Sequence, residues 1–241
     1  MTLNLKGKTV LVTGAGRGIG KTISLMLAKA GANVVVAART FDEIEQTADE
    51  IRSGDGEAMA VSADIAKEED VVTLFSEIHK KYGGLDVLIS NAGIGVYGPL
   101  ADFSVSDFDK IVDVNLRGTF LCCREAMRLM IPRKKGYIIN VSSVVGFKGY
   151  PNQSVYTAAK HGIMGLTKSL AVEAQEHGIR VSAVLPGGVD TQMVRESRPD
   201  LDPEELLQPE DIAQTIAYLL SLSDHAAVDQ VYVRRRNSSP F

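Results

Sequence analysis

The sequence predicts an α/β protein built as one domain, in which a seven-stranded parallel sheet is covered by helices on both faces. Seven short β-branched runs alternate with longer amphipathic stretches along the chain. The strand-like runs are apolar rather than alternating, which is typical of parallel strands buried on both faces. The length of 241 residues, with no linker or internal repeat, fits a single α/β domain over 1–241.

Each strand and helix is expected from its local pattern. Strands are expected at Thr9–Thr13, Asn33–Ala37, Glu57–Ser62, Leu85–Ser90, Tyr137–Ser142, Arg180–Leu185 and Val228–Arg234. Helices are expected from the first glycine turn to about Ala30, over Phe41–Ser53 and Lys67–Tyr82, in two stretches from about Asp107 to Met130, and over Ser154–Glu176 and Pro209–Leu222. The crossovers between the parallel strands should be right-handed.

The composition is that of an ordinary globular protein. Hydrophobic residues make up 45% and charged residues 23% of the chain, and its net charge is −4. We expect no nucleic-acid partner, because the basic run Arg234–Arg236 is short and is interpreted as a solvated chain end. No apolar stretch is long enough to cross a membrane or to form a signal peptide, so we expect a cytoplasmic protein.

The cysteines and histidines predict neither a disulfide nor a metal site. Cys122 and Cys123 are adjacent, and neighbouring side chains on a helix point in different directions, which disfavours an ordinary disulfide between them. Two free thiols suit a reducing cytosol. The four histidines, at positions 79, 161, 177 and 225, show no metal-ligand spacing.

A glycine-rich turn follows the first expected strand and opens the first helix. It reads Thr13-Gly14-Ala15-Gly16-Arg17-Gly18-Ile19-Gly20. Glycines let the backbone turn sharply and let amides approach a pyrophosphate at the positive end of a helix. A purely structural turn is the alternative, but the position in the first βαβ unit favours a nucleotide-binding Rossmann fold.

The glycine spacing resembles that of one family. Three residues separate Gly14 from Gly18, which differs from the plain dinucleotide fingerprint. The pattern Thr-Gly-x-x-x-Gly-x-Gly closely resembles that of the short-chain dehydrogenase/reductase family. The resemblance extends from Gly7 to about Val233 and implies a single-domain oxidoreductase.

The end of the second expected strand favours NADP(H) over NAD(H). Enzymes for NAD usually carry an acid there, whereas here the position is Ala38, followed by Arg39. Arg17 in the glycine turn adds a second guanidinium, and the two could clamp a 2′-phosphate with no carboxylate to repel it. In the family, basic residues at these two places imply NADP(H). The alternative is that Arg39 merely begins a helix in solvent.

Four residues match the Asn-Ser-Tyr-Lys tetrad of the family. Tyr156 and Lys160 are four residues apart on an expected helix and therefore share a face. Ser143 follows the fifth strand, and Asn115 lies in the helical region before it. Ser142 is a competing serine, and the family spacing favours Ser143.

The resemblance implies a catalytic role for each tetrad residue. Tyr156 gives a proton to a carbonyl oxygen when hydride from the nicotinamide reaches the carbon. Lys160 and the oxidised nicotinamide are expected to lower the pKa of Tyr156 towards neutral, and Lys160 also bonds the nicotinamide ribose. Ser143 bonds the substrate oxygen, and Asn115 holds a water that links the lysine to solvent.

Three further segments resemble cofactor-binding motifs of the family. Asp64-Ile65 resembles its adenine-contacting pair, and Pro186–Thr191 its nicotinamide-contacting segment. Ser90–Gly93 resembles its Asn-Asn-Ala-Gly motif, and Ser90 in place of the first Asn can still bond backbone groups. The expected cofactor-binding set is Gly14, Gly16, Arg17, Gly18, Ile19, Gly20, Arg39, Asp64, Ile65, Asn91, Ala92, Gly93, Tyr156, Lys160, Pro186, Gly187, Val189 and Thr191.

Two segments concern the substrate side. The connection from about Thr191 to Gln208 is expected to form a short lid, with a plain polar loop as the alternative. Many family members end with a strand and Val-Asp-Gly-Gly beside the active site. Here the last strand, Val228–Arg234, continues without those glycines.

The leading prediction is NADPH-dependent reduction of a small-molecule carbonyl, similar to that of 3-oxoacyl-[acyl-carrier-protein] reductases, with a substrate bound to acyl carrier protein as one option. The alternatives are a broad ketone or 3-hydroxy-acid dehydrogenase, and a catalytically inactive NADP-binding regulator, which the intact tetrad disfavours. Family members commonly form tetramers, so a homo-oligomer (tetramer or dimer) is implied. The apolar stripe of Ile163, Leu166 and Leu170 is needed for core packing in any case.

Overall fold

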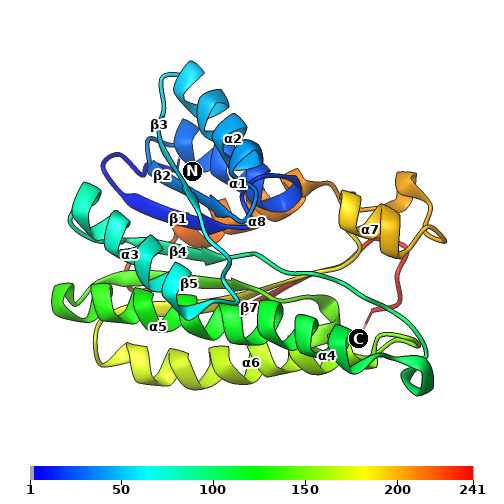
Figure 1. The fold of residues 1–241 in the computed structure, drawn as a ribbon. Helices are drawn as coiled ribbons and strands as arrows, with labels where there is room; N and C mark the ends of the chain where they lie inside the picture. Colours follow the sequence, from blue (N-terminus) through cyan, green and yellow to red (C-terminus); the bar gives the residue numbers. More distant parts are fainter. Residues whose placement is uncertain (1–2, 241) are drawn as a thin grey trace.

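One parallel sheet joins the seven strands of the computed structural model, which describes residues 3–240 (Figure 1). The strands are β1 (Thr9–Thr13), β2 (Asn33–Ala38), β3 (Glu57–Ser62), β4 (Val87–Ser90), β5 (Gly136–Val141), β6 (Ile179–Pro186) and β7 (Gln230–Val233). Their order is β3-β2-β1-β4-β5-β6-β7. The direction of winding changes between β1 and β4, which confirms the doubly wound sheet and marks the place where such sheets bind ligands.

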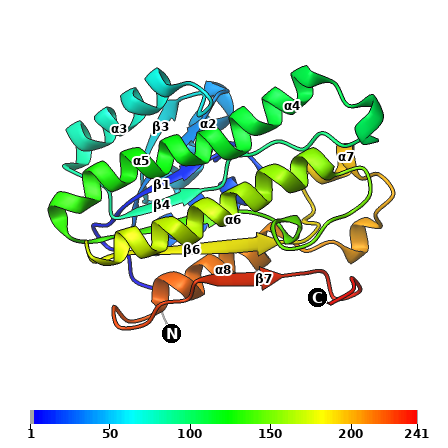
Figure 2. The ribbon, with the colours of Figure 1, turned by 90° about the horizontal axis from the view of Figure 1, so that it is seen from below.

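Helices cover both faces of the sheet (Figures 1 and 2). They are α1 (Gly18–Lys29), α2 (Phe41–Ser53), α3 (Glu68–Tyr82), α4 (Val105–Ile111), α5 (Gly118–Met130), α6 (Ser154–Gln175), α7 (Gln192–Ser197) and α8 (Pro209–Ser221). Helix α1 packs with α2 and α8 on one face, while α5 packs with α3 and α6 on the other. Among the helices of residues 3–240, none is both long and apolar enough to span a membrane.

The core forms two layers because successive strand residues point to opposite faces. On β1, Val10 and Val12 pack with Ile23 in one hydrophobic cluster. Leu11, between them, packs with Leu74 in the other cluster. All five side chains are fully buried, and each such burial contributes about 1.5–3 kcal/mol to stability. Because both faces of the sheet are packed, its central strands need apolar residues at successive positions rather than at alternate ones.

Both cysteines are free and buried. Cys123 donates a hydrogen bond from Sγ to Oδ1 of Asn140 at 3.3 Å. Burial raises the pKa of the Cys123 thiol to about 12 and raises the pKa of Cys122 still further. Both thiols are therefore protonated packing groups in the second core layer.

The helical region before β5 differs from the two separate stretches that the sequence predicts. Helices α4 and α5 are joined without a break by a π-helical turn, Val112–Arg117. In this turn Asn115 donates a side-chain hydrogen bond to the carbonyl of Ile111 at 3.0 Å. A π-turn adds one residue to the helical repeat, which a search for α-helical spacing does not detect.

The segment 191–208 is more ordered than the expected loop. It contains α7 and a 3₁₀ turn, Pro203–Glu205. The Thr191 side chain caps α7 by accepting from the amide of Val194 at 3.4 Å. The amide of Leu207 donates to the carbonyl of Gly188 at 3.0 Å, so the far end of the segment is tied to the sheet edge. A six-residue helix is too short for its hydrophobic period to be read.

The turn between β1 and α1 is fixed against the end of β4. Gly14 and Gly18 have positive φ angles of 66° and 53°, which favour glycine. Nδ2 of Asn91 donates to the carbonyl of Thr13 at 3.0 Å. A Cβ atom on Gly20 would overlap the carbonyl oxygen of Gly14 and lie 2.7 Å from Nδ2 of Asn91. The turn therefore closes only because position 20 has no side chain.

Replacing Gly20 with alanine should destabilise the protein. The added methyl must displace the Gly14 carbonyl, and such overpacking costs about 1–3 kcal/mol, which lowers Tm by on the order of 2–10 °C. The measurement is thermal unfolding followed by circular dichroism. The control is Gly165→Ala on α6, where a Cβ atom meets nothing within 4 Å. Alanine there should stabilise by about 0.5–1 kcal/mol. Equal Tm values for the two variants would contradict this account.

Candidate active site

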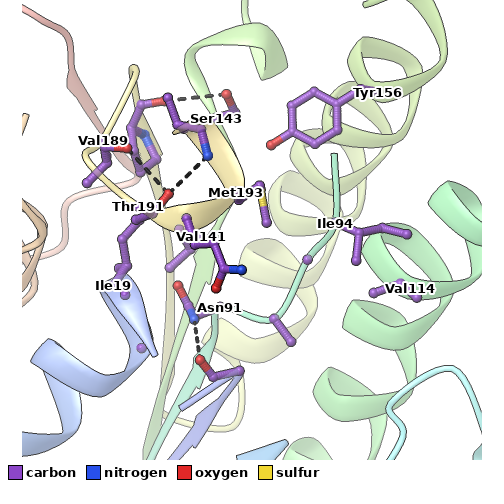
Figure 3. A pocket seen from close by; sticks show the side chains of 18 of the residues that line it. Ile19, Asn91, Ile94, Val114, Val141, Ser143, Tyr156, Val189, Thr191 and Met193 are labelled. Carbon is purple, nitrogen blue, oxygen red and sulfur yellow. Dashed lines mark hydrogen bonds between the residues drawn. The ribbon is translucent and has the colours of Figure 1, made fainter. Parts of the chain in front are cut away.

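A cavity of about 530 Å³ lies at the carboxyl edge of the sheet (Figure 3). It is lined by the segments that follow β1 to β6, by α7 and by the C-terminal tail. Every residue of the expected cofactor-binding set lines it. Of the four tetrad residues, Ser143, Tyr156 and Lys160 line it, and Asn115 lies just outside. Folding thus gathers at one place residues that are far apart in the sequence.

The glycine turn forms one wall of the cavity. A Cβ atom on Gly14 would lie 2.9 Å from Cα of Ala92, and one on Gly16 would lie 2.8 Å from Cβ of Glu43. Arg17 precedes the first turn of α1, and among the described residues no side chain caps that turn. The first residues of α1, Gly18, Ile19 and Gly20, line the cavity. This wall has the features that an anionic pyrophosphate requires.

Arg17 and Arg39 both line the cavity near the end of β2. Nη1 of Arg17 donates to Oε1 of Gln192 on α7 at 2.8 Å, a contact that links the turn to the expected lid. Arg39 is exposed. The binding of a 2′-phosphate by these two guanidinium groups stays a prediction.

The expectation that no carboxylate lies near this pair is wrong. Oε1 of Glu43 is 3.8 Å from Nη1 of Arg17, and Glu43 also lines the cavity. Glu43 reaches this position because the first turn of α2 packs on the glycine turn, where Thr47 donates to the carbonyl of Ala15 at 3.2 Å. The sequence does not predict the contact between α2 and the glycine turn, because Glu43 comes several residues after the end of β2.

The segments after β3 and β4 form the next part of the wall. Asp64 accepts the amide of Ala66 at 3.1 Å, and its neighbour Ile65 lines the cavity. Oγ1 of Thr13 accepts the amides of Asn91 and Ala92 at 3.0 and 3.1 Å. Thr13 therefore holds the start of the Asn-Ala-Gly segment.

The role expected for Ser90 is wrong. Its Oγ is buried and has no hydrogen-bond partner among the described residues, so it does not bond backbone groups. Serine is one atom shorter in reach than the asparagine of the family motif, and the nearby amides of Asn91 and Ala92 are taken by Thr13.

Tyr156 and Lys160 point from one face of α6 towards the end of β5. Nζ of Lys160 lies 5.6 Å from the centre of the Tyr156 ring and donates to the carbonyl of Val141 at 3.2 Å. Ser143 donates to the carbonyl of Pro186 at 3.4 Å. In Figure 3 the hydroxyl of Tyr156 points into the cavity, on whose wall Ser143 also lies. The Tyr156 phenol and the Lys160 side chain therefore lie beside each other on the cavity that Ser143 also lines.

The geometry also separates the two serines. The Ser142 hydroxyl donates to the carbonyl of Lys160 at 3.1 Å, and its residue is 4% exposed. It is therefore occupied in holding α6 against β5. Ser143 is only partly buried, so it is the better placed of the two to meet a ligand.

Asn115 acts on the backbone beside the cavity. Its Nδ2 donates to the carbonyl of Ile94 at 3.0 Å, and its Oδ1 accepts the amide of Ile94 at 3.3 Å. A Cβ atom on Gly93 would lie 2.7 Å from Oδ1 of Asn115 and 3.6 Å from Nζ of Lys160. Asn115 therefore positions the segment after β4, and only glycine at position 93 lets that segment pass between Asn115 and Lys160.

Burial dominates the proton affinities of the site. It lowers the pKa of Lys160 to about 8. Burial also raises the pKa of Tyr156, the nearby Tyr97 raises it further, and Ser143 lowers it. The lowering expected from the sequence combines Lys160 with the positive charge of the oxidised nicotinamide, so it stays a prediction for the cofactor complex.

Tyr97 is a site residue that sequence reasoning missed. Its ring packs edge-on against the Tyr156 ring with centres 5.4 Å apart, and burial raises its pKa. It also lines the cavity, four residues beyond Gly93. A tyrosine in a loop carries no periodic signal, and only the tertiary structure brings it to Tyr156.

The interpretation of Arg234–Arg236 as a solvated chain end is wrong. The side chain of Arg235 is 19% exposed and lines the cavity. Arg234 donates from Nη1 to the carbonyls of Arg235, Arg236 and Ser238 at 3.1, 3.1 and 2.7 Å, which folds the tail into a turn. The amide of Gly187 donates to the carbonyl of Val233 at 2.7 Å, so β7 directs the tail across the carboxyl edge of the sheet.

Comparisons with known sequences agree with the geometry. A family model described as short chain dehydrogenase matches residues 8–202. The 3-oxoacyl-[acyl-carrier-protein] reductase FabG of Staphylococcus epidermidis is 39% identical over 223 residues, which cover 89% of this chain and 91% of that protein. An uncharacterized oxidoreductase of Thermotoga maritima is 39% identical over 207 residues, covering 86% and 82% of the two chains.

Solved structures give the same result. A metagenomic short-chain oxidoreductase in complex with NADP is 33% identical, with a TM-score of 0.85 over 97% of this chain and 99% of that one. A short-chain type dehydrogenase/reductase from Mycobacterium marinum is 32% identical, with a TM-score of 0.92 over 99% and 98%. The chain therefore belongs to the short-chain dehydrogenase family and is an oxidoreductase, as its glycine turn and its tetrad predict.

Proposed function

We propose that this protein reduces a carbonyl group to a hydroxyl with NADPH. The observation that carries the proposal is the meeting of Ser143, Tyr156 and Lys160 in the cavity that the glycine turn also lines. The relatives named 3-oxoacyl-[acyl-carrier-protein] reductase support the reaction class. The metagenomic relative in complex with NADP supports the cofactor.

The residues around the cavity fit NADP(H) along its whole length. Arg17 and Arg39 would hold the 2′-phosphate, and the first turn of α1 the pyrophosphate. Lys160 would bond the nicotinamide ribose. The segment Pro186–Thr191, which contains Gly187 and Val189, would meet the carboxamide. The carboxylate of Glu43 weakens the phosphate end, because it competes for Arg17 at 3.8 Å.

Each tetrad residue has a distinct task in this proposal. Bound NADPH supplies the hydride to the carbonyl carbon. Tyr156 gives its proton to the carbonyl oxygen, and its buried phenol with a raised pKa carries that proton at neutral pH. Ser143 donates a hydrogen bond to the same oxygen as charge develops there. Lys160 stabilises the phenolate that remains, and Asn115 keeps the adjoining backbone in place.

The carbonyl compound itself is a 3-oxoacyl thioester or a related ketone in this proposal, with acyl carrier protein as one carrier. A broad ketone or 3-hydroxy-acid dehydrogenase is the second candidate. One observation favours it: the C-terminal tail, with Arg235, borders the cavity where the family motif has glycines. Segment 191–208 would act as the lid, because Gln192 already contacts Arg17.

The homo-oligomer and the cytoplasmic location stay predictions. Ile163 and Leu170, on the stripe noted in the sequence, are buried in the core of the single chain. The apolar side chains that remain available on the long helices are different ones, such as Phe120 on α5, 43% exposed, and Val172 on α6, 73% exposed. These are the side chains that contact between copies would cover.

Purified protein should oxidise NADPH in the presence of a 3-oxoacyl or simple ketone substrate, and Tyr156→Phe should lower turnover by about 10²–10⁴-fold. The phenylalanine ring preserves packing but has no proton to give, so NADPH binding should survive. Absorbance at the NADPH band and fluorescence titration measure the two properties. The control is Tyr218→Phe, at an exposed position on α8. If NADPH binds but no carbonyl compound is reduced, the inactive regulator is the correct function.

Replacing Arg39 with aspartate should shift cofactor preference towards NADH. The change removes a charge-assisted contact to the 2′-phosphate and adds a repulsive carboxylate, so kcat/KM for NADPH should fall by about 10–100-fold. Activity with NADH, which has no 2′-phosphate, serves as the internal control. An unchanged ratio of the two kcat/KM values would mean that the 2′-phosphate is bound elsewhere.

The pH profile of reduction should report Lys160. Its pKa of about 8 means that the ammonium is present below this pH and is lost above it. With saturating NADPH, kcat/KM for the carbonyl substrate should therefore be level below pH 8 and fall as pH rises through that value. A profile still level about one pH unit higher would exclude Lys160 as the titrating group.

A further inference from the structure

Arg235 is a cation on the cavity wall whose hydrogen-bonding capacity is unused. Its side chain is 19% exposed, and its Cδ would lie 3.5 Å from a Cβ atom on Gly188. Within residues 3–240 its guanidinium makes no hydrogen bond, and its ion-pair contact is to Oε2 of Glu205 at 3.7 Å. A guanidinium has five N–H donors, and leaving them unmet in a largely buried place is unfavourable.

The neighbouring arginines are, by contrast, satisfied. Arg195 donates two hydrogen bonds to Asp190 at 2.7 and 2.8 Å. Arg198 donates two to Asp200, both at 2.7 Å. Of these three arginines, Arg198 and Arg235 line the cavity. Arg235 differs in that its carboxylate contact, to Glu205 at 3.7 Å, is an ion pair without a hydrogen bond. Its planar fork is suited to bind a carboxylate.

The charge around Arg235 favours an anion. Among the described residues that line the cavity, only Glu43 and Asp64 carry carboxylates, and both lie at the cofactor end. The opposite end contains Arg198 and Arg235. Asp200 and Glu205, the partners of these two arginines, do not line the cavity and offset only part of this charge. The guanidinium groups that border the cavity therefore attract a negative group to this end.

The backbone at Arg235 packs on the segment that Ser143 contacts. Nζ of Lys148 donates to the carbonyl of Ser239 at 2.8 Å, which fixes the tail beyond Arg235. The backbone amide of Arg235 would lie 3.3 Å from a Cβ atom on Gly187. The residue before Gly187 is Pro186, whose carbonyl accepts from Ser143 at 3.4 Å. The backbone at Arg235 and the hydroxyl of Ser143 therefore both contact the Pro186-Gly187 part of the cavity wall.

We propose that Arg235 binds a carboxylate of the substrate, so that the preferred substrates are oxo acids with a free carboxylate. This inference rests on the proposed reductase function and adds the substrate class. The ketone carbon gains the hydride of NADPH, its oxygen gains the Tyr156 proton, and the carboxylate is unchanged. The product is a hydroxy acid. A thioester or ester of the same acid lacks the charge that Arg235 binds.

The test uses 2-, 3- and 4-oxo acids, each beside its methyl ester, with NADPH and the full chain. The wild-type protein should prefer the acid to its ester for at least one chain length. Arg235→Met keeps the aliphatic contact with Gly188 and removes the charge, so the acid-to-ester ratio of kcat/KM should fall by about 10- to 100-fold, mainly through KM. Arg235→Lys should restore part of the preference. Arg236→Met, at an exposed position outside the cavity, is the matched control.

The outcomes separate this inference from the reductase proposal. Reduction of neutral ketones and esters as fast as acids at every length would overturn the role of Arg235 and leave the reductase function intact. Faster reduction of a 3-oxoacyl thioester on acyl carrier protein than of every oxo acid would also overturn the role of Arg235 and leave the reductase function intact. A binding test needs no turnover: saturated carboxylic acids, which cannot be reduced, are titrated into the protein–NADPH complex by calorimetry. Binding should occur in the wild type and be lost in Arg235→Met, and equal binding by both would exclude the site.

Discussion

The junction between the glycine turn and the end of β4 is the constraint on which the rest of the site depends. Thr13 and Asn91 exchange side-chain and backbone hydrogen bonds across neighbouring strands. Gly20 lets the two segments close because no Cβ atom blocks the Gly14 carbonyl. This contact lies where the winding of the sheet changes, so it sets the distance between the cofactor wall and the tetrad.

The reacting end depends on a balance between burial and charge. Burial lowers the pKa of Lys160 and raises that of Tyr156, so it shifts both groups towards their uncharged forms. Such a site holds a proton on Tyr156 and makes its loss depend on charge that arrives with the ligands. The same low dielectric strengthens every hydrogen bond made to a developing oxyanion. Burial thus affects both the protonation of Tyr156 and the strength of the hydrogen bonds in this pocket.

The C-terminal tail lines the cavity and lacks the glycines with which many family members end. It lies beyond residues 8–202, which the family model matches. Arg234 turns the tail by bonding three of its carbonyls, and the turn places Arg235 beside Gly188. A segment that is free to vary can change substrate choice while the sheet and the tetrad keep the reaction.

The sequence by itself determined the strands, the main helices, the cofactor wall and the family, because apolar periods and glycine positions are local properties of the chain. In the structure, every residue that it assigns to cofactor binding lines one cavity. Only the tertiary structure decided the roles of Glu43, Tyr97 and Arg235 and the choice of Ser143 over Ser142 by contact. These depend on which helix, loop or tail folds across the sheet edge. Such contacts join residues distant in sequence, and no local pattern encodes them.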